Sequence, residues 1–170
     1  MLPPLPALKH LGGLAARLPV VIVDTREQEP LPISRLPTIR AGLYTGDYSV
    51  AGLETLFAIE RKSIEDLVSC CCSSARERFE HELHRLRGYR FKRLLVIGQR
   101  AEIELHRYRS TITPAAVLGS LAAFEVRYDL PVVWADTPTA AAALVECWTW
   151  YFAREAVQGV NNLFRQAAIT

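Results

Sequence analysis

The stretch GDYSVAGLETLFAIERKSIED, Gly46 to Asp66, decides the fold that we predict for this chain. A turn at Gly46 leads into a short strand and Leu56–Lys62 forms a second one, so the two pair as an antiparallel hairpin. Because side chains alternate along a strand, Glu60 and Lys62 share one face while Arg61 lies on the other. An acid and an ammonium group therefore emerge side by side from one strand, where they can hold a metal ion and position a water.

The segments around this hairpin predict a sheet covered by helices. Val20–Val23 is a continuous apolar run, typical of a strand buried on both faces, and Asp24 ends it. Three prolines between Thr25 and Arg40 predict an irregular connection. Further strands are expected over Arg93–Gly98 and Val132–Trp134, and helices over Ser63–Ser69, Ala75–Arg87, Thr113–Arg127 and Thr137–Val157. This order of elements predicts one α/β domain with a central sheet.

Length and composition fit a single folded domain. The chain has 170 residues, of which 50% are hydrophobic, enough to bury a core without disulfides. We divide it into an N-terminal arm (1–18), a folded domain (19–158) and a C-terminal tail (159–170). The formal charge of +2 is too small to indicate nucleic acid binding by itself, so the local distribution of charge has to decide.

The sequence favours a reduced, intracellular protein. Prolines and glycines interrupt its apolar start, which argues against a signal peptide, and no uncharged run reaches the ~20 residues that a membrane span requires. Cys70, Cys71, Cys72 and Cys147 lack the spacing of a zinc site or a disulfide framework, so we interpret them as small apolar residues. We expect a soluble protein, with a cytoplasmic location and no membrane contact.

Three acids could converge on one metal ion. Asp24 ends the first predicted strand, Asp47 begins the second and Glu60 lies on the third. Carboxylate oxygens favour Mg²⁺ or Mn²⁺ over zinc, and Lys62 could orient a water or stabilise negative charge. The spacing alone is also compatible with Glu60 and Lys62 as solvated neighbours and Asp47 as an ordinary turn residue.

The complete set of motifs resembles the nuclease domain of XPF-type (ERCC4-domain) structure-specific endonucleases, of the PD-(D/E)xK superfamily. Its signature is Gly-Asp, then Glu-Arg-Lys, then three residues and an Asp, which Asp66 completes. The motifs that carry the resemblance are VIVDTRE (Val21–Glu27), GDYSV (Gly46–Val50), IERKSIEDL (Ile59–Leu67) and RFEHELHRL (Arg78–Leu86). The resemblance implies a restriction-endonuclease-like fold, in which helices flank a mixed β-sheet. It also implies metal-dependent cleavage of DNA at junctions, flaps or forks, in repair or recombination.

Carried over position by position, the resemblance assigns a catalytic set. Asp24, Asp47 and Glu60 match the metal ligands, Lys62 matches the catalytic lysine and Arg61 matches the signature arginine. Asp66 is better explained as an acid in the first turn of a helix than as a ligand.

Two further arginines match polar positions of this family and are candidates for binding a DNA phosphate. Arg26 follows the first strand and Arg78 occupies the place of an arginine that faces the active site. Either could instead form a structural ion pair, with Glu27 or Glu80, because a guanidinium suits both tasks.

A basic patch between a predicted helix and strand adds candidate DNA contacts. Aromatic residues interleave with its bases, and phosphate binding depends on such side chains. The candidates are Arg85, Arg90, Lys92 and Arg93. Arg85 and the neighbouring Arg87 have an alternative to DNA contact. They could lie at a solvated helix end, where their positive charges complement the helix dipole.

The last predicted helix is more apolar than one buried stripe requires. Aromatic residues follow one another almost in succession at Trp148, Trp150, Tyr151 and Phe152. They indicate either a homodimer interface through the C-terminal helices or a helix covered within one subunit. Family members commonly append a tandem helix-hairpin-helix module that grips duplex DNA, and only about a dozen residues follow Val157. Affinity would then come from this domain, from a dimer or from an additional protein partner.

Two other functions stay open. An exonuclease or a resolvase could use the same fold, and a catalytically inactive DNA-binding scaffold would need only the surface. The presence of Asp47, Glu60 and Lys62 favours an active enzyme.

Overall fold

The structure is a computed structural model that describes residues 2–3, 6 and 18–167, so most of the arm predicted over 1–18 lies outside it. Six strands form one mixed sheet in the order β2-β1-β3-β4-β5-β6. The strands are β1 (Val21–Asp24), β2 (Thr38–Ala41), β3 (Tyr48–Val50), β4 (Phe57–Ser63), β5 (Phe91–Ile97) and β6 (Val132–Ala135).

The predicted hairpin lies at the centre of this sheet. β3 pairs antiparallel with β4 through Tyr48 and Ile59, as predicted, and also pairs antiparallel with β1. β4 and β5 are parallel over seven pairs, from Phe57–Phe91 to Ser63–Ile97. A parallel pair needs a crossover connection, which helices α1 (Ile64–Cys70) and α2 (Ser73–Leu86) supply.

Local signals start several helices where the sequence predicts them. Ser63 caps α1, because its Oγ accepts a hydrogen bond from the Asp66 backbone N–H at 3.1 Å. Thr113 likewise accepts from the Ala116 N–H at 3.3 Å. The remaining helices are α3 (Arg100–Glu104), α4 (Pro114–Tyr128) and α5 (Pro138–Ala167).

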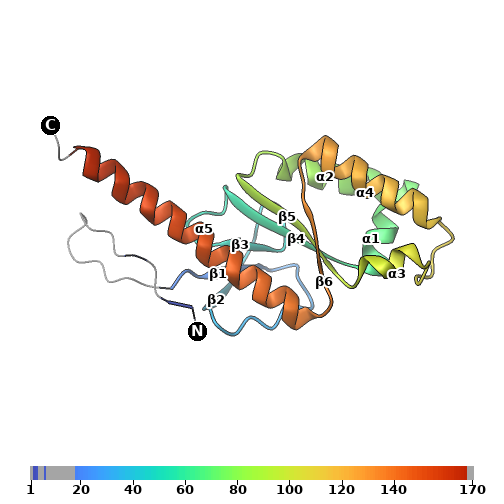
Figure 1. Ribbon diagram of the computed structural model, residues 1–170, viewed down its shortest axis with the longest axis horizontal. Coiled ribbons are helices and arrows are strands. Elements are labelled where there is room, and N and C mark those ends of the chain that lie inside the picture. The colour runs from blue at the N-terminus through green and yellow to red at the C-terminus, as the bar shows by residue number, and fades with distance from the viewer. Residues whose placement is uncertain (1, 4–5, 7–17, 168–170) are drawn as a thin grey trace.

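Each face of the sheet buries a separate apolar cluster. On one face, α1, α2 and α4 pack over Leu94 and Val96, and this cluster includes Cys70 and Cys71. On the other face, α5 covers strand residues such as Leu95 (Figure 1). The helices on both faces of a mixed sheet confirm the predicted α/β architecture.

The aromatic residues of α5 mostly pack on this second face. Trp148 lies 5.9 Å from Phe91, and Phe152 lies 5.2 Å from Phe57, measured between ring centroids. Trp150 is buried, whereas Tyr151 is exposed. This part of the helix therefore covers its own sheet, and a homodimer through the C-terminal helices stays a prediction.

Three elements differ from the sequence prediction. β2 lies in the segment predicted to be irregular, because pairing with β1 in parallel register, Val21 with Thr38, makes a strand of four mostly exposed residues. α3 forms in a segment predicted as a polar connection. α5 continues to Ala167 instead of ending near Val157, and its last turns project beyond the sheet (Figure 1).

Within the described residues, no helix has both the length and the apolar character needed to cross a membrane.

Candidate active site

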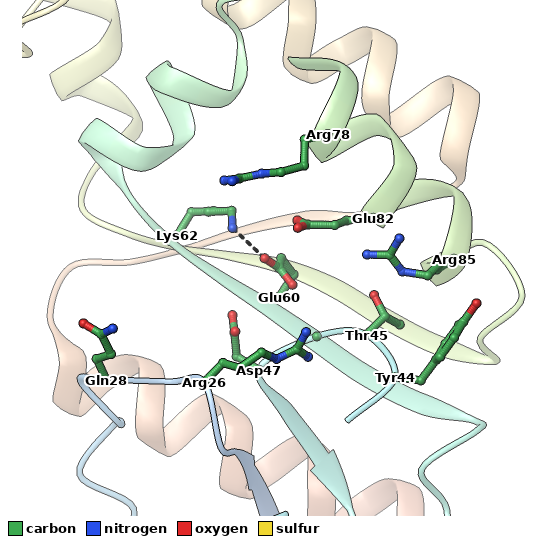
Figure 2. Close-up of a pocket in the computed structure, with 11 residues that line it drawn as sticks. Arg26, Gln28, Tyr44, Thr45, Asp47, Glu60, Lys62, Arg78, Glu82 and Arg85 are labelled. Carbon is green, nitrogen blue, oxygen red and sulfur yellow. Dashed lines mark hydrogen bonds and ion pairs between the residues drawn. The ribbon is translucent and has the colours of Figure 1, made fainter. Parts of the chain in front are cut away.

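A polar cavity of about 590 Å³ opens between the loop that precedes β3, strand β4 and helix α2 (Figure 2). Acids and bases from these three segments and from the connection after β1 point into it together. Its lining residues are Arg26, Gln28, Tyr44, Thr45, Gly46, Asp47, Glu60, Lys62, Arg78, Glu82 and Arg85.

The backbone fixes Asp47 between two strands. Its N–H donates to the Ile59 carbonyl and its carbonyl accepts from the Asp24 N–H, both at 2.8 Å. Its Oδ2 accepts from the Arg61 N–H at 2.7 Å. Gly46 has φ of +81°, and a Cβ there would lie 3.1 Å from the Ile59 carbonyl oxygen, so the close approach favours glycine. Burial raises the pKa of the Asp47 carboxyl above its usual range.

Glu60 and Lys62 form a short ion pair at the floor of the cavity. Lys62 Nζ lies 2.6 Å from Glu60 Oε1 and 5.3 Å from the centre of the Phe79 ring. Burial, together with the neighbouring Asp47 charge, raises the pKa of Glu60 to about 7. Burial opposes the charge on Lys62, yet the adjacent Glu60 carboxylate raises its pKa overall. The predicted placement of both side chains on one face is confirmed.

Asp24 lies beside the cavity without lining it. Its carboxylate accepts from the Arg26 side chain at 2.7 and 3.1 Å and from the Arg26 N–H at 2.8 Å. It also accepts from the Leu43 N–H at 2.6 Å. Burial alone would raise its pKa, but these hydrogen bonds lower it. The carboxylate is thus occupied as a clamp on the loop that leads to Asp47, and its role as a metal ligand stays a prediction.

Arg61 points away from the cavity and makes a two-point contact with Glu27. Arg61 Nε and Nη2 donate to the Glu27 carboxylate at 3.0 and 3.1 Å. The two ion pairs considered for Arg26 and Arg78 are therefore not formed. Arg26 pairs with Asp24, and the acid considered for Arg78, Glu80, instead pairs with Arg76, Arg127 and the Tyr128 hydroxyl.

Arg26, Arg78 and Arg85 place guanidinium groups at the cavity, as Figure 2 shows. Within the part of the chain that the structure describes, Arg78 has no ion pair. Glu82 lines the same wall and opposes the ionisation of Glu60. Arg26 is paired with Asp24, so Arg78 and Arg85 leave positive charge available at a site that also holds three acids.

The other predicted DNA contacts lie outside the cavity. Lys92 is buried, and its Nζ lies 2.8 Å from Asp129 Oδ2. Arg93 stacks on Phe91 at 4.2 Å, and Arg90 lies 5.8 Å from the Phe152 ring. DNA contact by these three residues stays a prediction.

Two cavity carboxylates, Asp47 and Glu60, are the candidate metal ligands. Among the described residues, no group of three or more His, Cys, Asp or Glu side chains is arranged to hold a metal ion. Mg²⁺ is commonly bound by one or two carboxylates together with waters and substrate phosphates. The buried Glu60 and the partly buried Asp47, both with raised pKa values and open to a polar cavity, fit that requirement.

Sequence reasoning assigned no role to four cavity residues, Gln28, Tyr44, Thr45 and Glu82. Tyr44 and Thr45 directly precede the Gly46-Asp47 pair in the sequence, so their position next to a predicted ligand was an available signal. Gln28 lies in the segment predicted to be irregular and carries no comparable signal.

The comparisons with known proteins give a family match and a fold match. The model of the ERCC4 domain matches residues 23–147. No curated protein matches the chain. Two solved structures of XPF from Aeropyrum pernix are similar to it. The first has a TM-score of 0.65 and a sequence identity of 22%, and the match covers 80% of this chain. The second is a complex with DNA; it has a TM-score of 0.60 and a sequence identity of 20%, and the match covers 81% of this chain. The match spans 66% of the Aeropyrum chain in both cases, and it shows the XPF nuclease fold that the sequence predicted.

Proposed function

This chain belongs to the ERCC4 domain family, and from that premise we propose that it is a metal-dependent endonuclease that hydrolyses phosphodiester bonds in branched DNA. The observation that carries the proposal is the convergence of Asp47, Glu60 and Lys62 in one polar cavity. Hydrolysis of a phosphodiester needs an activated water and compensation of negative charge, and this cavity holds groups for both.

Asp47 and Glu60 would hold the metal ion, Mg²⁺ or Mn²⁺. A bound divalent ion supplies a more acidic water and neutralises charge on the phosphate oxygens. Asp47 is positioned for this by the strand backbone on both sides. Glu60 shares its carboxylate with Lys62, so the ammonium group is held within reach of the same space.

Lys62 would orient the attacking water and stabilise the negative charge that develops on the phosphate. Its place on the rigid strand β4, over the Phe79 ring, restricts its movement. Arg78 supplies a further cation for a DNA phosphate, since it lines the cavity and no ion pair within the described residues engages it. Asp24 and Arg61 act on this site indirectly, through Leu43 and the Asp47 carboxylate.

Branched DNA is the proposed substrate because of the resemblance to XPF-type enzymes. The similar protein from Aeropyrum pernix was solved in a complex with DNA. Within this chain, Arg26, Arg78 and Arg85 surround the carboxylates and could contact phosphates on either side of the cut.

We extend the proposal to a homodimer that uses the exposed part of α5. Tyr151 and Leu163 are apolar or aromatic side chains that are 52% and 70% exposed on this helix. Sedimentation at micromolar concentration should give about twice the 19.0 kDa of one chain. A monomer under these conditions would contradict the dimer and leave the nuclease proposal intact.

A cleavage assay on a labelled fork, with Mg²⁺ or with EDTA, tests the function. Wild-type protein should nick the fork only with Mg²⁺, and Asp47→Ala and Lys62→Ala should abolish the activity. Asp136→Ala is the matched control, because Asp136 is an exposed acid outside the cavity. Metal-dependent cutting that proceeds only from free ends would identify an exonuclease. If the wild-type protein does not cut DNA in the presence of Mg²⁺, the proposed enzymatic function is wrong.

A further inference from the structure

One end of the cavity contains buried polar atoms that the fold leaves unsatisfied. The hydroxyl of Thr45 and Nε of Arg85 are buried and have no hydrogen-bond partner among the described residues. Thr45 is only 4% exposed, and both residues line the cavity. A buried polar atom without a partner is unfavourable for folding and calls for an explanation, such as a ligand.

An exposed aromatic ring lies at the same end. Tyr44 is 78% exposed, and its ring centre is 6.0 Å from the guanidinium carbon of Arg85. Figure 2 shows Tyr44, Thr45 and Arg85 together on one side of the cavity, with Asp47 and Glu60 next to them. Aromatic rings and guanidinium planes are surfaces on which unstacked nucleic acid bases stack.

The loop that carries these residues is held at both ends. The Leu43 N–H donates to Asp24 at 2.6 Å, and the Leu43 carbonyl accepts from Arg26 Nη2 at 2.9 Å. On the other side of Tyr44 and Thr45, the Asp47 backbone is bonded to Ile59 and Asp24. The two side chains are therefore presented from a pre-positioned segment, which lowers the entropy lost on binding.

We propose that Tyr44, Thr45 and Arg85 form a subsite for one unpaired nucleotide beside the catalytic carboxylates. The base stacks on Tyr44, while Arg85 and the Thr45 hydroxyl donate hydrogen bonds to its phosphate. Neighbouring base pairs cover the base faces in a continuous duplex, so Tyr44 selects strands that are already splayed. This inference rests on the proposed function and makes it more specific, because it assigns the preference for branched DNA to three residues.

The test compares the affinities for two DNA probes of the same sequence, one fully paired and one with a splayed arm. Fluorescence anisotropy is measured at fixed salt with Ca²⁺ in place of Mg²⁺. Tyr44→Ala should weaken binding of the splayed probe about 10-fold and change duplex binding less than about twofold. Tyr44→Phe should retain the preference, and Tyr44→Leu should lose it. If Tyr44→Ala weakens the binding of both probes equally, or weakens the binding of neither probe, the proposed subsite is wrong.

Thr45→Val gives a second variant, because it removes the unpartnered hydroxyl and nearly keeps the shape. We expect weaker binding of the splayed probe without a fall in Tm. The matched control is Thr149→Val, since Thr149 on α5 also has a buried hydroxyl without a partner among the described residues and lies outside the cavity. The control should leave the preference unchanged. A Thr45→Val protein that binds both probes as the wild type does would contradict the role of this hydroxyl.

Cleavage of the same probes separates the two proposals. If the wild type cuts DNA and Tyr44→Ala retains the preference for the splayed probe, the subsite is wrong and the nuclease stands. If the wild type neither binds nor cuts either probe, the proposed function fails, and the subsite fails with it.

Discussion

Strand β4 takes part in two acid–base pairs, one on each face of the sheet. Glu60 and Lys62 meet through one contact of 2.6 Å at the cavity. Arg61 and Glu27 meet through two contacts of 3.0 and 3.1 Å, and Glu27 also accepts from the Glu29 N–H at 2.9 Å. In the second pair both carboxylate oxygens are engaged, whereas within the described residues Glu60 uses only Oε1.

The Glu27–Arg61 pair fixes the geometry of the backbone around it, whereas the Glu60–Lys62 pair keeps a carboxylate oxygen that can bind a ligand. A two-point guanidinium–carboxylate contact has defined geometry and leaves little capacity for another ligand. Glu60 is buried beside Asp47, and the pKa of Glu60 is raised to about 7. Its carboxylate still faces the cavity. A cation would be favourable there.

The largest expected effect is on catalysis. Lys62→Met should lower the cleavage rate at least about 10³-fold, because the substitution removes the donor that stabilises the developing charge. The free energy of unfolding should change little at pH 7, because Glu60 can take up a proton when its partner is lost. Single-turnover cleavage and urea unfolding of the same preparation measure both. Loss of activity together with a large loss of stability would assign Lys62 a structural role.

Breaking the other pair should act mainly on stability. Glu27→Ala leaves the Arg61 guanidinium, only 18% exposed, without its carboxylate, which should cost about 4 kcal/mol of unfolding free energy. Glu29→Ala, which removes an exposed acid two residues away, is the control and should cost almost nothing. Urea unfolding measures the difference. Similar values for the two variants would mean that the Glu27–Arg61 pair does not hold the segment after β1 against β4.

The pH dependence of stability tests the raised pKa of Glu60. A carboxyl whose pKa is higher in the folded state binds protons preferentially when folded, so its contribution is lost as pH rises between about 4.5 and 7. Without metal, Glu60→Gln should gain up to about 3 kcal/mol relative to the wild type across that window. Unfolding curves in EDTA from pH 4 to pH 8 provide the measurement. A difference that stays constant with pH would show that burial does not perturb Glu60.

The smallest effect concerns the approach of the Asp47 loop to β4. Gly46→Ala should destabilise the protein by about 1 kcal/mol more than Gly52→Ala. Both glycines have φ of +81°, but only at Gly46 does an added Cβ meet other atoms, the Ile59 carbonyl oxygen at 3.1 Å. The comparison therefore isolates the contact from the backbone strain. Thermal unfolding of both variants gives the result, and equal effects would mean that the loop can move away.

Short-range patterns predicted much of the framework. The hydroxyls of Ser63 and Thr113 start helices as expected, since a cap acts within a few residues. Alternation along β4 correctly placed Glu60 and Lys62 on one face. β2 was missed because it exists through pairing with β1, which local propensity does not report.

The candidate site was predictable in its acids and lysine, but not in the contacts that decide their roles. The motif brought Asp47, Glu60 and Lys62 together correctly. The Asp24 carboxylate accepts a hydrogen bond from Leu43, 19 residues along the chain, and no local pattern predicts that contact. Lys92 looked accessible within a basic run, yet its strand register buries it.

The clamp that Asp24 and Arg26 place on Leu43 has a consequence for protein engineering. Leu43 and Asp47 are both fixed through their backbone atoms, so the side chains of Tyr44 and Thr45 between them can be exchanged without moving either anchor. A library randomised at these two positions would then vary the preference for DNA structure while the cutting chemistry stays constant. The specificity of the proposed nuclease could thus be changed through two residues of one loop, with the rest of the protein left as it is.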